Sequence, residues 1–426
     1  MKKILVISWY FPPVNSSEGL VTFKLLKNSE YEYDVFTQKK SSNWAYNNTE
    51  TKLISNNINT IFCDKKNINE WVKEGIEYYK KNQENYDIVM TRSMAPESHE
   101  IGLEIKKINP NIKWIASFGD PIAKNPYQQI YKIVSPYQVK GQGMLELGIK
   151  RILSPKRILL NWVWNYRNKK YIKYNTRIER DEVLQKEVFE CADKIIFNST
   201  YQMNYMCENN NKVIEKGIVI PHSFDEDFYN KAKKRNDKIV ISYVGHCDEI
   251  RTPKQFFEAL TKLKEHDENL KDKLEVSFYG DLADRDKVII IDNDLTEIVK
   301  VRKNVSYFES LDIMSNSNWL LLIDANLSTI LDNNIFFAAK LADYLGSKTP
   351  IFGITMYNGP SADILRETNN IVSSFSVEEI YMNLREILDG KIKGSNYNRE
   401  KYNAKKVAQD FDTMVENLIK DEKWKR

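Results

Sequence analysis

The sequence predicts an α/β protein made of two units, each with a parallel sheet covered on both faces by helices. Short apolar runs alternate with helical stretches along the chain, which is typical of parallel sheets that are buried on both faces. The alternation restarts near the middle of the chain. A length of 426 residues suits two or three domains of about 150 residues each.

In the first half, six apolar runs are predicted to be strands. They are Ile4–Ser8, Tyr33–Thr37, Ile58–Cys63, Asp87–Thr91, Ile112–Phe118 and Lys194–Asn198. Helical patterns lie between several of them. One begins around Leu20, and in another Ile101, Ile105 and Ile108 recur at helical spacing.

The same alternation predicts six strands and several helices in the second half. The strands are Ile218–Ile220, Ile239–Val244, Glu275–Tyr279, Val305–Phe308, Trp319–Asp324 and Thr349–Ile354, and the helices include Pro253–Lys264 and Phe337–Leu345. We therefore expect two Rossmann-like domains, 1–212 and 213–397, and a helical tail, 398–426, that packs back on the first. Two such domains face each other across a cleft, and ligands bind there at the carboxyl ends of strands.

Residues 128–190 form a predicted helical insertion in the first domain. Within it, the stretch 150–180 interleaves Lys and Arg with Trp and Tyr. This mixture suits the surface of an anionic membrane, although an ordinary solvated helix pair explains it equally well. Nucleic acid is not the expected partner, because 63 basic against 59 acidic side chains leave little excess charge.

The composition places the chain among folded proteins without disulfides. An apolar fraction of 42% supports well-filled cores and excludes a disordered chain. The cysteines Cys63, Cys191, Cys207 and Cys247 are too scattered for a zinc site or a disulfide framework. No run approaches the roughly 18 apolar residues of a spanning helix. We expect a cytoplasmic protein, peripheral at most to the inner face of the membrane.

The first candidate site follows the predicted strand Ile239–Val244. Gly245 would let a ligand approach the backbone. Thr252 and Gln255 have the spacing of a capping box, so a helix would begin here with amides that attract anions. Arg251 stands beside this helix start, and its planar guanidinium suits phosphate oxygens. A solvent-exposed loop with a chance arginine is the alternative.

The second candidate site lies on the predicted helix Phe337–Leu345. Lys340 and Asp343 share one face of this helix, and a carboxylate can accept both hydrogen bonds that a ribose donates. Gly346 would be the C-cap. A surface ion pair three residues apart, worth a few tenths of a kcal/mol, is the alternative for these two charges.

Two polar residues of the first domain are expected to contact substrate. His99 and Asp120 follow the predicted strands Asp87–Thr91 and Ile112–Phe118, so both lie on the cleft side. A histidine at a helix start is often a cap or a surface residue. An aspartate before Pro121 can simply fix a turn.

Together these motifs resemble the GT-B glycosyltransferases of family 4. The resemblance rests on Lys3–Val6 with Phe11-Pro12-Pro13 and Ser17-Glu18-Gly19, on Ala192–Ile196 with Asn198-Ser199, on Ile220-Pro221-His222 with Phe224-Asp225, on Tyr243-Val244-Gly245 with Arg251, and on Lys340–Tyr344 with Pro350-Ile351. These motifs follow the family's order over nearly the whole chain. The resemblance implies a retaining, metal-independent transfer of a sugar from a nucleotide-diphosphate sugar. A UDP-sugar is the expected donor, without a cofactor, and the acceptor would be a glycan or lipid-linked precursor of bacterial surface polysaccharides or glycoconjugates.

The resemblance also implies the residues that would form the site. Catalysis would involve His99, Asp120 and Arg251, and the acceptor would contact Glu18 and His99. The donor's nucleotide and phosphates would be bound by Gly19, Gly245, His246, Arg251, Asn334, Ile335, Phe336, Lys340 and Asp343. No metal ligands are expected.

Two positions depart from the family pattern. His246 replaces the first residue of a basic pair, and Ile335 replaces the first of two acidic residues spaced eight apart. The missing acid normally contacts the donor sugar, a role that backbone amides near Asn334–Phe337 would have to share. A non-catalytic GT-B partner subunit therefore stays open as an alternative. A nucleotide-sugar 2-epimerase, which also has two Rossmann-like domains, is another.

Overall fold

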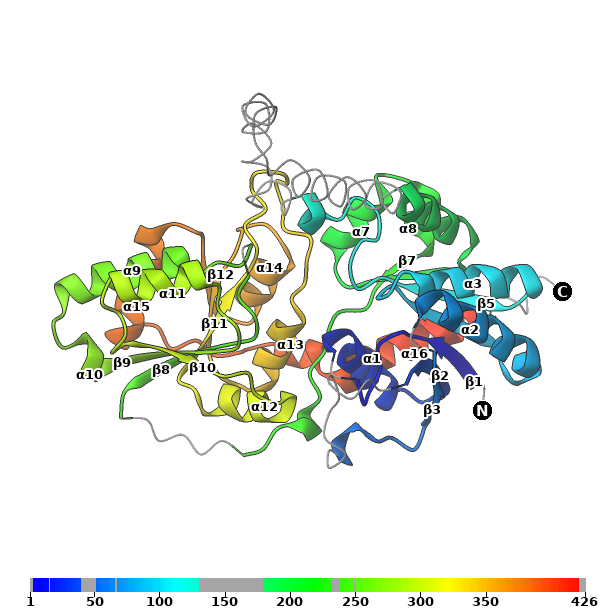
Figure 1. Cartoon of the computed structure of the whole chain (residues 1–426), viewed down its shortest axis with the longest axis horizontal. Coiled ribbons are helices and arrows are strands. Elements are labelled where there is room, and N and C mark those ends of the chain that lie inside the picture. The colour runs from blue at the N-terminus through cyan, green and yellow to red at the C-terminus, as the bar shows by residue number, and fades with distance from the viewer. Residues whose placement is uncertain are drawn as a thin grey trace, which may run out of the picture.

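The computed structural model describes residues 3–14, 16–39, 51–65, 67–129, 179–231, 237–248 and 250–420. They form two lobes, each built on one parallel sheet (Figure 1). We call the part around strands β1 to β7 the first lobe and the part around β8 to β13 the second lobe. The predicted architecture of two Rossmann-like domains is confirmed.

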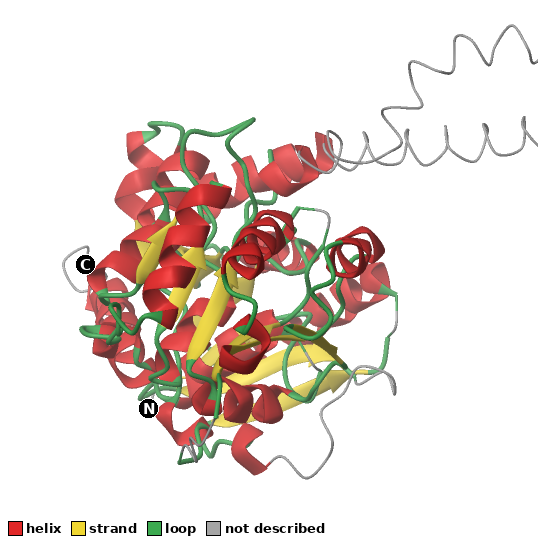
Figure 2. Cartoon of the chain, turned by 90° about the vertical axis from the view of Figure 1, so that its left-hand side faces the viewer, coloured by secondary structure: helices red, strands yellow, loops and turns green. Residues whose placement is uncertain are grey.

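The first lobe contains a seven-stranded parallel sheet in the order β3-β2-β1-β4-β5-β6-β7. Its strands are β1 (Lys3–Ile7), β2 (Glu32–Gln38), β3 (Ile58–Cys63), β4 (Ile88–Arg92), β5 (Lys113–Ser117), β6 (Lys194–Phe197) and β7 (Gly217–Val219). The central strands are buried on both faces, and this explains their unbroken apolar runs. The helices of the first lobe are α1 (Ser17–Lys27), α2 (Ile68–Asn82), α3 (Glu97–Ile108), α7 (Thr200–Cys207), α8 (Asn211–Lys216) and a helix over 179–191. Figure 2, in which the second lobe faces the viewer, shows helices on both sides of the strands.

The second lobe contains a six-stranded parallel sheet in the order β10-β9-β8-β11-β12-β13. Its strands are β8 (Ile239–Val244), β9 (Leu274–Tyr279), β10 (Val299–Arg302), β11 (Trp319–Ile323), β12 (Ile351–Ile354) and β13 (Ile371–Ser373). Its helices are α9 (Lys254–His266), α10 (Leu270–Lys273), α11 (Asp284–Asp292), α12 (Tyr307–Asn316), α13 (Ala339–Gly346), α14 (Pro360–Glu367) and α15 (Val377–Leu388).

Each sheet has one point where the strand order reverses. In the first sheet it lies between β1 and β4, and in the second between β8 and β11. The connections leave the sheet in opposite directions on the two sides of such a point, so a crevice opens at the carboxyl ends of the two strands. The fold therefore places its natural binding crevices after β1 and β4 and after β8 and β11.

One predicted strand, Val305–Phe308, is wrong. These residues lead into α12, because Ser306 caps this helix in a capping box with Glu309. The edge strand of the sheet lies earlier, at β10. The short edge strand β13 at the other side was not expected from the sequence.

The boundary between the lobes lies later than residue 212. β7 pairs in parallel with β6, so the first sheet continues to Val219. The chain then crosses to the second lobe. On this crossing segment Phe228 is buried and contacts Phe23 of α1 and Phe308 of α12, with ring centroids 6.4 Å and 5.4 Å away. The segment that crosses between the lobes thus forms an apolar contact with both of them.

The tail forms α16 (Ala404–Lys420), which packs against α1 of the first lobe. The Asp412 carboxylate accepts hydrogen bonds from Ser29 Oγ at 2.5 Å and from the amide of Glu30 at 2.9 Å. Phe411, on the same helix, is fully buried. The tail helix is therefore part of the first lobe, although it follows the second lobe in the sequence.

Most of the predicted insertion, residues 130–178, lies outside the described part of the chain, and so does nearly all of the basic and aromatic stretch 150–180. Among the residues that the structure describes, no helix combines the length and apolar character needed to cross a bilayer.

Replacing Phe411 by alanine should destabilise the protein by about 3–5 kcal/mol, because it leaves a large cavity where α16 joins the first lobe. Asp410→Ala is the matched control, since Asp410 is exposed on the same helix and pairs only with Lys406. It should change stability by less than about 0.5 kcal/mol. Thermal unfolding compares the two variants, and equal melting temperatures would contradict the proposed docking.

Candidate active site

The two lobes enclose a cavity of about 250 Å³ beside the carboxyl ends of β8 and β9. Four residues of α1 line it from the first lobe: Ser17, Leu20, Val21 and Lys24. The second lobe contributes Val244, Gly245, Tyr279, Asn304, Val305, Ser306, Tyr307, Ser310, Met314, Ala339, Lys340 and Asp343. Three residues that the sequence singled out, Gly245, Lys340 and Asp343, thus border one space between the lobes.

Gly245 brings the backbone after β8 close to a lysine. Its φ of +123° is strained for any other residue, and an added Cβ would lie 2.7 Å from Lys340 Nζ. A side chain at this position would displace the ammonium group. The need for glycine here therefore comes first from the positive φ, since the flexible end of Lys340 could shift.

Lys340 lies in a largely buried position beside an aromatic ring. Its Nζ donates a 2.8 Å hydrogen bond to the Tyr243 hydroxyl and stands 4.2 Å from that ring's centroid. Burial lowers the pKa of Lys340 to about 8, and the neighbouring charge of Arg251 lowers it further. The nearby carboxylate of Asp324 compensates only in part. The site thus holds a cation that gains from a further negative charge.

Asp343 joins the lobes instead of pairing with Lys340. Its Oδ1 accepts a 2.8 Å bond from Lys24 Nζ of α1 and a 2.9 Å bond from the Tyr307 hydroxyl. Lys24 is almost fully buried. The alternative of a surface ion pair between Lys340 and Asp343 is therefore wrong. Any ribose at Asp343 would share the carboxylate with these two donors.

Arg251 also reaches the other lobe. Its Nη2 donates a 2.9 Å hydrogen bond to the Tyr127 hydroxyl, and its Nη1 lies 3.9 Å from Asp248 Oδ2. The Tyr127 ring stacks on Phe336 of the second lobe, with centroids 3.9 Å apart and an interplanar angle of 14°. The guanidinium is half-buried where the lobes meet, so the alternative of a chance arginine on an exposed loop does not hold.

The helix after Arg251 begins differently from the expectation. Its N-cap is Pro253, and the Thr252 hydroxyl accepts a 3.2 Å bond from the amide of Lys254 while donating to the buried Asp286 at 2.8 Å. The predicted capping box of Thr252 with Gln255 is wrong, because Asp286 orients the hydroxyl. Arg251 thus keeps its place beside the helix start.

The helix of the second candidate site also differs at both ends. α13 begins at Ala339, so Phe337 precedes it. Gly346 is its last residue, and Ser347 is the C-cap, so the predicted C-cap is wrong. A Cβ on Gly346 would lie 2.2 Å from the Tyr229 hydroxyl. Close packing explains this glycine.

Asp120 lies where the first lobe approaches Arg251. Burial raises the pKa of Asp120 to about 6, the charge of Glu18 adds to this rise, and Arg251 opposes it. The three charged groups are therefore close enough to influence one another. Of the two predicted catalytic residues of the first lobe, Asp120 is therefore the one whose charge interacts with Arg251.

Glu18 at the start of α1 is held by an arginine from β4. Arg92 Nη2 lies 2.6 Å from Glu18 Oε1, and both side chains are mostly buried. A Cβ on Gly119 would lie 2.7 Å from Glu18 Oε2, and one on Gly19 would lie 3.1 Å from the backbone of Phe11. These close approaches fix α1 at the reversal point of the first sheet.

His99 follows β4 as expected, but its side chain points into the core. It is fully buried, its Nδ1 lies 2.6 Å from Thr91 Oγ1, and its ring packs between Trp114 and Phe118. Burial lowers the pKa of His99 to about 3, so the imidazole is neutral. In this conformation the His99 side chain has no exposed surface with which to contact a substrate.

Two other histidines lie in contrasting places. His246 has a side chain that is 63% exposed, with Nδ1 3.9 Å from Asp281 Oδ2. His222 is buried against Phe337, and burial lowers its pKa to about 3. Only His246 can meet a ligand from solvent in this conformation.

The segment at the missing acid is apolar. Ile335 is buried in a cluster that also contains Ile250, Leu327 and Met356. Asn334 Oδ1 accepts a 3.0 Å hydrogen bond from the amide of Phe336, so this amide is already engaged. In this conformation the Phe336 amide is therefore not free to share the role of the missing acid. A donor sugar would meet an apolar wall on this side.

Several residues of the site were missed by the sequence analysis. Lys24, Arg92, Tyr127, Tyr243 and Tyr307 all contact candidate residues. Arg92 could have been found, because it ends a strand at a reversal point of the sheet order. Tyr243 lies in β8, two residues before Gly245, whereas Lys24, Tyr127 and Tyr307 lie in helices and carry no local signal. Within the described ranges, no group of three or more His, Cys, Asp or Glu side chains could hold a metal ion.

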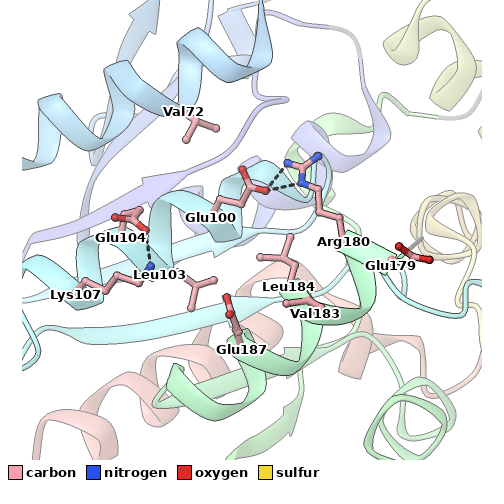
Figure 3. A pocket seen from close by; sticks show the side chains of 10 residues that line it. All are labelled: Val72, Glu100, Leu103, Glu104, Lys107, Glu179, Arg180, Val183, Leu184 and Glu187. Carbon is pink, nitrogen blue, oxygen red and sulfur yellow. Dashed lines mark hydrogen bonds and ion pairs between the residues drawn. The ribbon is translucent and has the colours of Figure 1, made fainter. Parts of the chain in front are cut away.

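A larger cavity, of about 520 Å³, lies between α3 and the helix 179–191 (Figure 3). Its charged groups are largely paired with one another, Arg180 with Glu100 and Lys107 with Glu104. Val183 and Leu184 form part of its apolar wall. Its lining residues all come from the first lobe, so we place the active site in the cavity that both lobes line.

Solved structures of similar fold include a sucrose-phosphate synthase, a galactosyltransferase and a UDP-GlcNAc 2-epimerase. No protein-family model matches the sequence, and no curated protein matches it. Among solved structures, sucrose-phosphate synthase from Thermosynechococcus elongatus superposes with a TM-score of 0.67 at 13% identity, over 99% of this chain and 100% of that one. The lipopolysaccharide outer core galactosyltransferase WaaB gives 0.59 at 12% identity, over 99% of both chains. The UDP-GlcNAc 2-epimerase from Methanocaldococcus jannaschii gives 0.51 at 11% identity, over 98% of this chain and 99% of that one. The chain has the GT-B fold.

Replacing Asp120 by asparagine should stabilise the protein above pH 6. The folded-state pKa of Asp120 is raised from 3.8 to about 6. Ionisation therefore costs stability as the pH rises from about 4 to 6, by up to about 3 kcal/mol, and below pH 4 both states are protonated. Melting temperatures measured between pH 4 and 8 should diverge with rising pH, the variant being higher. A constant difference would contradict the assigned environment.

Proposed function

We propose that the protein is a retaining glycosyltransferase that uses a nucleotide-diphosphate sugar, with UDP-sugar as the donor. One observation supports this most: Arg251 and Lys340 lie near one another at the carboxyl ends of the second sheet, beside the glycine loop and a cavity between the lobes. A diphosphate is the ligand whose charge suits two cations and an open backbone. The similarity of fold to sugar-nucleotide enzymes supports the same class.

The proposed chemistry needs charge stabilisation rather than a covalent group. The bond between the sugar's anomeric carbon and the phosphate oxygen breaks, and the leaving diphosphate gains negative charge. Arg251 and the ammonium of Lys340 would stabilise this charge in a partly buried site, where such contacts are strong. Their positive charges are the reason for proposing transfer without a metal ion.

The nucleoside is proposed to occupy the cavity beside Asp343. Tyr279, Asn304 and Tyr307 line it from the second lobe. The hydroxyls of the ribose would donate to the carboxylate of Asp343, in place of or beside Lys24. Binding here would therefore act on a contact that already joins the lobes.

The acceptor is proposed to enter from the first lobe, where Glu18 and Asp120 lie. Its hydroxyl oxygen would attack the anomeric carbon from the face that the diphosphate leaves. Because the attack comes from that face, the new bond keeps the configuration at the anomeric carbon. The proton of the acceptor hydroxyl would pass to the departing phosphate. His99 has no part in this step as the structure stands, because it is fully buried.

A glycan or lipid-linked acceptor of bacterial surface polysaccharide synthesis is part of the proposal, and so is contact with an anionic membrane through residues 150–180.

Reversing the charges of Lys169, Lys170 and Lys173 should weaken co-sedimentation with anionic liposomes, because each basic residue near the surface contributes about 1 kcal/mol. Neutral liposomes provide the control. Unchanged sedimentation of the variant would contradict the membrane contact.

A nucleotide-sugar 2-epimerase is the second candidate, favoured by the fold similarity to the archaeal UDP-GlcNAc 2-epimerase. An epimerase turns over its sugar nucleotide without an acceptor. A non-catalytic partner subunit, suggested by Ile335 in its apolar cluster, would bind the nucleotide and turn over nothing. Incubation with UDP-sugars, with and without cell-extract acceptors, separates the three candidates.

Arg251→Ala should lower sugar transfer by about 10²–10³-fold, because it removes one charged donor to the leaving group. It should also reduce the rise in melting temperature that UDP causes in the unmodified protein. Arg302→Ala is the matched control, since Arg302 is exposed at the edge strand and pairs with Glu275. Normal turnover and an undiminished UDP shift in Arg251→Ala would refute the assignment.

A further inference from the structure

A tyrosine of the first lobe holds the arginine of the second. Tyr127 lies just after the loop that follows Asp120, and its hydroxyl accepts the hydrogen bond from Arg251 Nη2 at 2.9 Å. The arginine's Cζ lies 5.1 Å from the centre of the same ring. Both hydrogen bonding and the face of the ring therefore define where the guanidinium points.

The phenol is itself fixed from both sides. Its ring stacks on Phe336 of the second lobe at 3.9 Å. The loop before it is held by Asn125, which accepts a bond from the amide of Tyr127 at 3.0 Å and donates one to the carbonyl of Pro121 at 3.0 Å. This fixed acceptor restricts the rotamers of Arg251 before a ligand binds. Less conformational entropy is then lost when the arginine contacts the ligand.

The contact leaves the arginine able to bind an anion. A guanidinium has five N–H donors in a rigid plane, and the bond to Tyr127 uses one of them. Burial raises the pKa of the Tyr127 phenol, so the group stays neutral and does not cancel the charge of Arg251. The arginine is thus oriented without being neutralised.

We propose that Tyr127 is a positioning residue that aligns Arg251 for the diphosphate only when the lobes are closed. The proposal rests on the proposed function, because it assumes that a diphosphate binds at Arg251. It goes further, because residues of both lobes then form the phosphate site. Opening the cleft would separate the Tyr127 hydroxyl from the guanidinium that it orients. Diphosphate affinity is thereby coupled to closure.

A second contact between the lobes provides the matched control. The Tyr201 hydroxyl of α7 donates a 2.8 Å hydrogen bond to Asp363 Oδ2 of α14. This phenol also bridges the two lobes, but its partner is a carboxylate on α14 and not Arg251. If any hydrogen bond between the lobes sufficed, Tyr201→Phe and Tyr127→Phe would have the same effect.

The test is a double-mutant cycle read by calorimetric titration with UDP and GDP, using the nucleotide that binds the unmodified protein more tightly. Tyr127→Phe, which keeps the ring stack, should weaken binding roughly tenfold, the value of one hydrogen bond to a charged group. Tyr201→Phe should stay within about twofold of the unmodified protein. In the Arg251→Ala background, Tyr127→Phe should cause no further loss, because its effect acts through that arginine.

Each outcome decides the matter. Equal losses in Tyr127→Phe and Tyr201→Phe, or a full loss for Tyr127→Phe in the Arg251→Ala background, would overturn the positioning role while leaving the proposed function intact. An unchanged affinity in Tyr127→Phe would do the same. If neither nucleotide binds the unmodified protein, the proposed function fails and the positioning role fails with it.

Discussion

The buried positive charge between the lobes is the constraint on which the rest of the site depends. Burial destabilises the charged form of Lys340 by more than the nearby carboxylates of Asp324 and Asp248 stabilise it. The pKa of Lys340 therefore falls to about 8. Arg251 stands in the same region, hydrogen-bonded to a neutral phenol and 3.9 Å from the carboxylate of Asp248. A site of this kind is improved by a ligand that brings negative charge. The loop at Gly245 and the cavity beside it supply the space for such a ligand.

Several contacts between the lobes involve this site or border it. Lys24 with Asp343, Tyr127 with Arg251, and the apolar packing around Phe228 tie α1 and the loop after Asp120 to the second lobe. The lobes are therefore held together by both polar and apolar side-chain contacts. Substrate entry must break some of these contacts, and the binding free energy that restores them can be used to order the reacting groups.

The sequence predicted the architecture well and the details of the site only in part. Apolar runs buried on both faces located most of the strands, because the pattern reflects burial alone. It failed at Val305–Phe308, where a capping serine outweighs the apolar run. Glycine and charged residues after strands located Gly245, Arg251 and Asp120. Side-chain direction was beyond reach, so the burial of His99 could not be foreseen. Contacts such as that of Tyr127 with Arg251 depend on how two lobes meet, which no local pattern records.

The central claim is that a diphosphate binds between the lobes at Arg251 and Lys340. A crystal structure of the protein with UDP tests it most directly. The account predicts that the diphosphate lies beside Gly245, within hydrogen-bonding distance of both cations, and that the nucleoside occupies the cavity next to Asp343. Nucleotide bound elsewhere, with both side chains lacking a phosphate contact, would contradict the account.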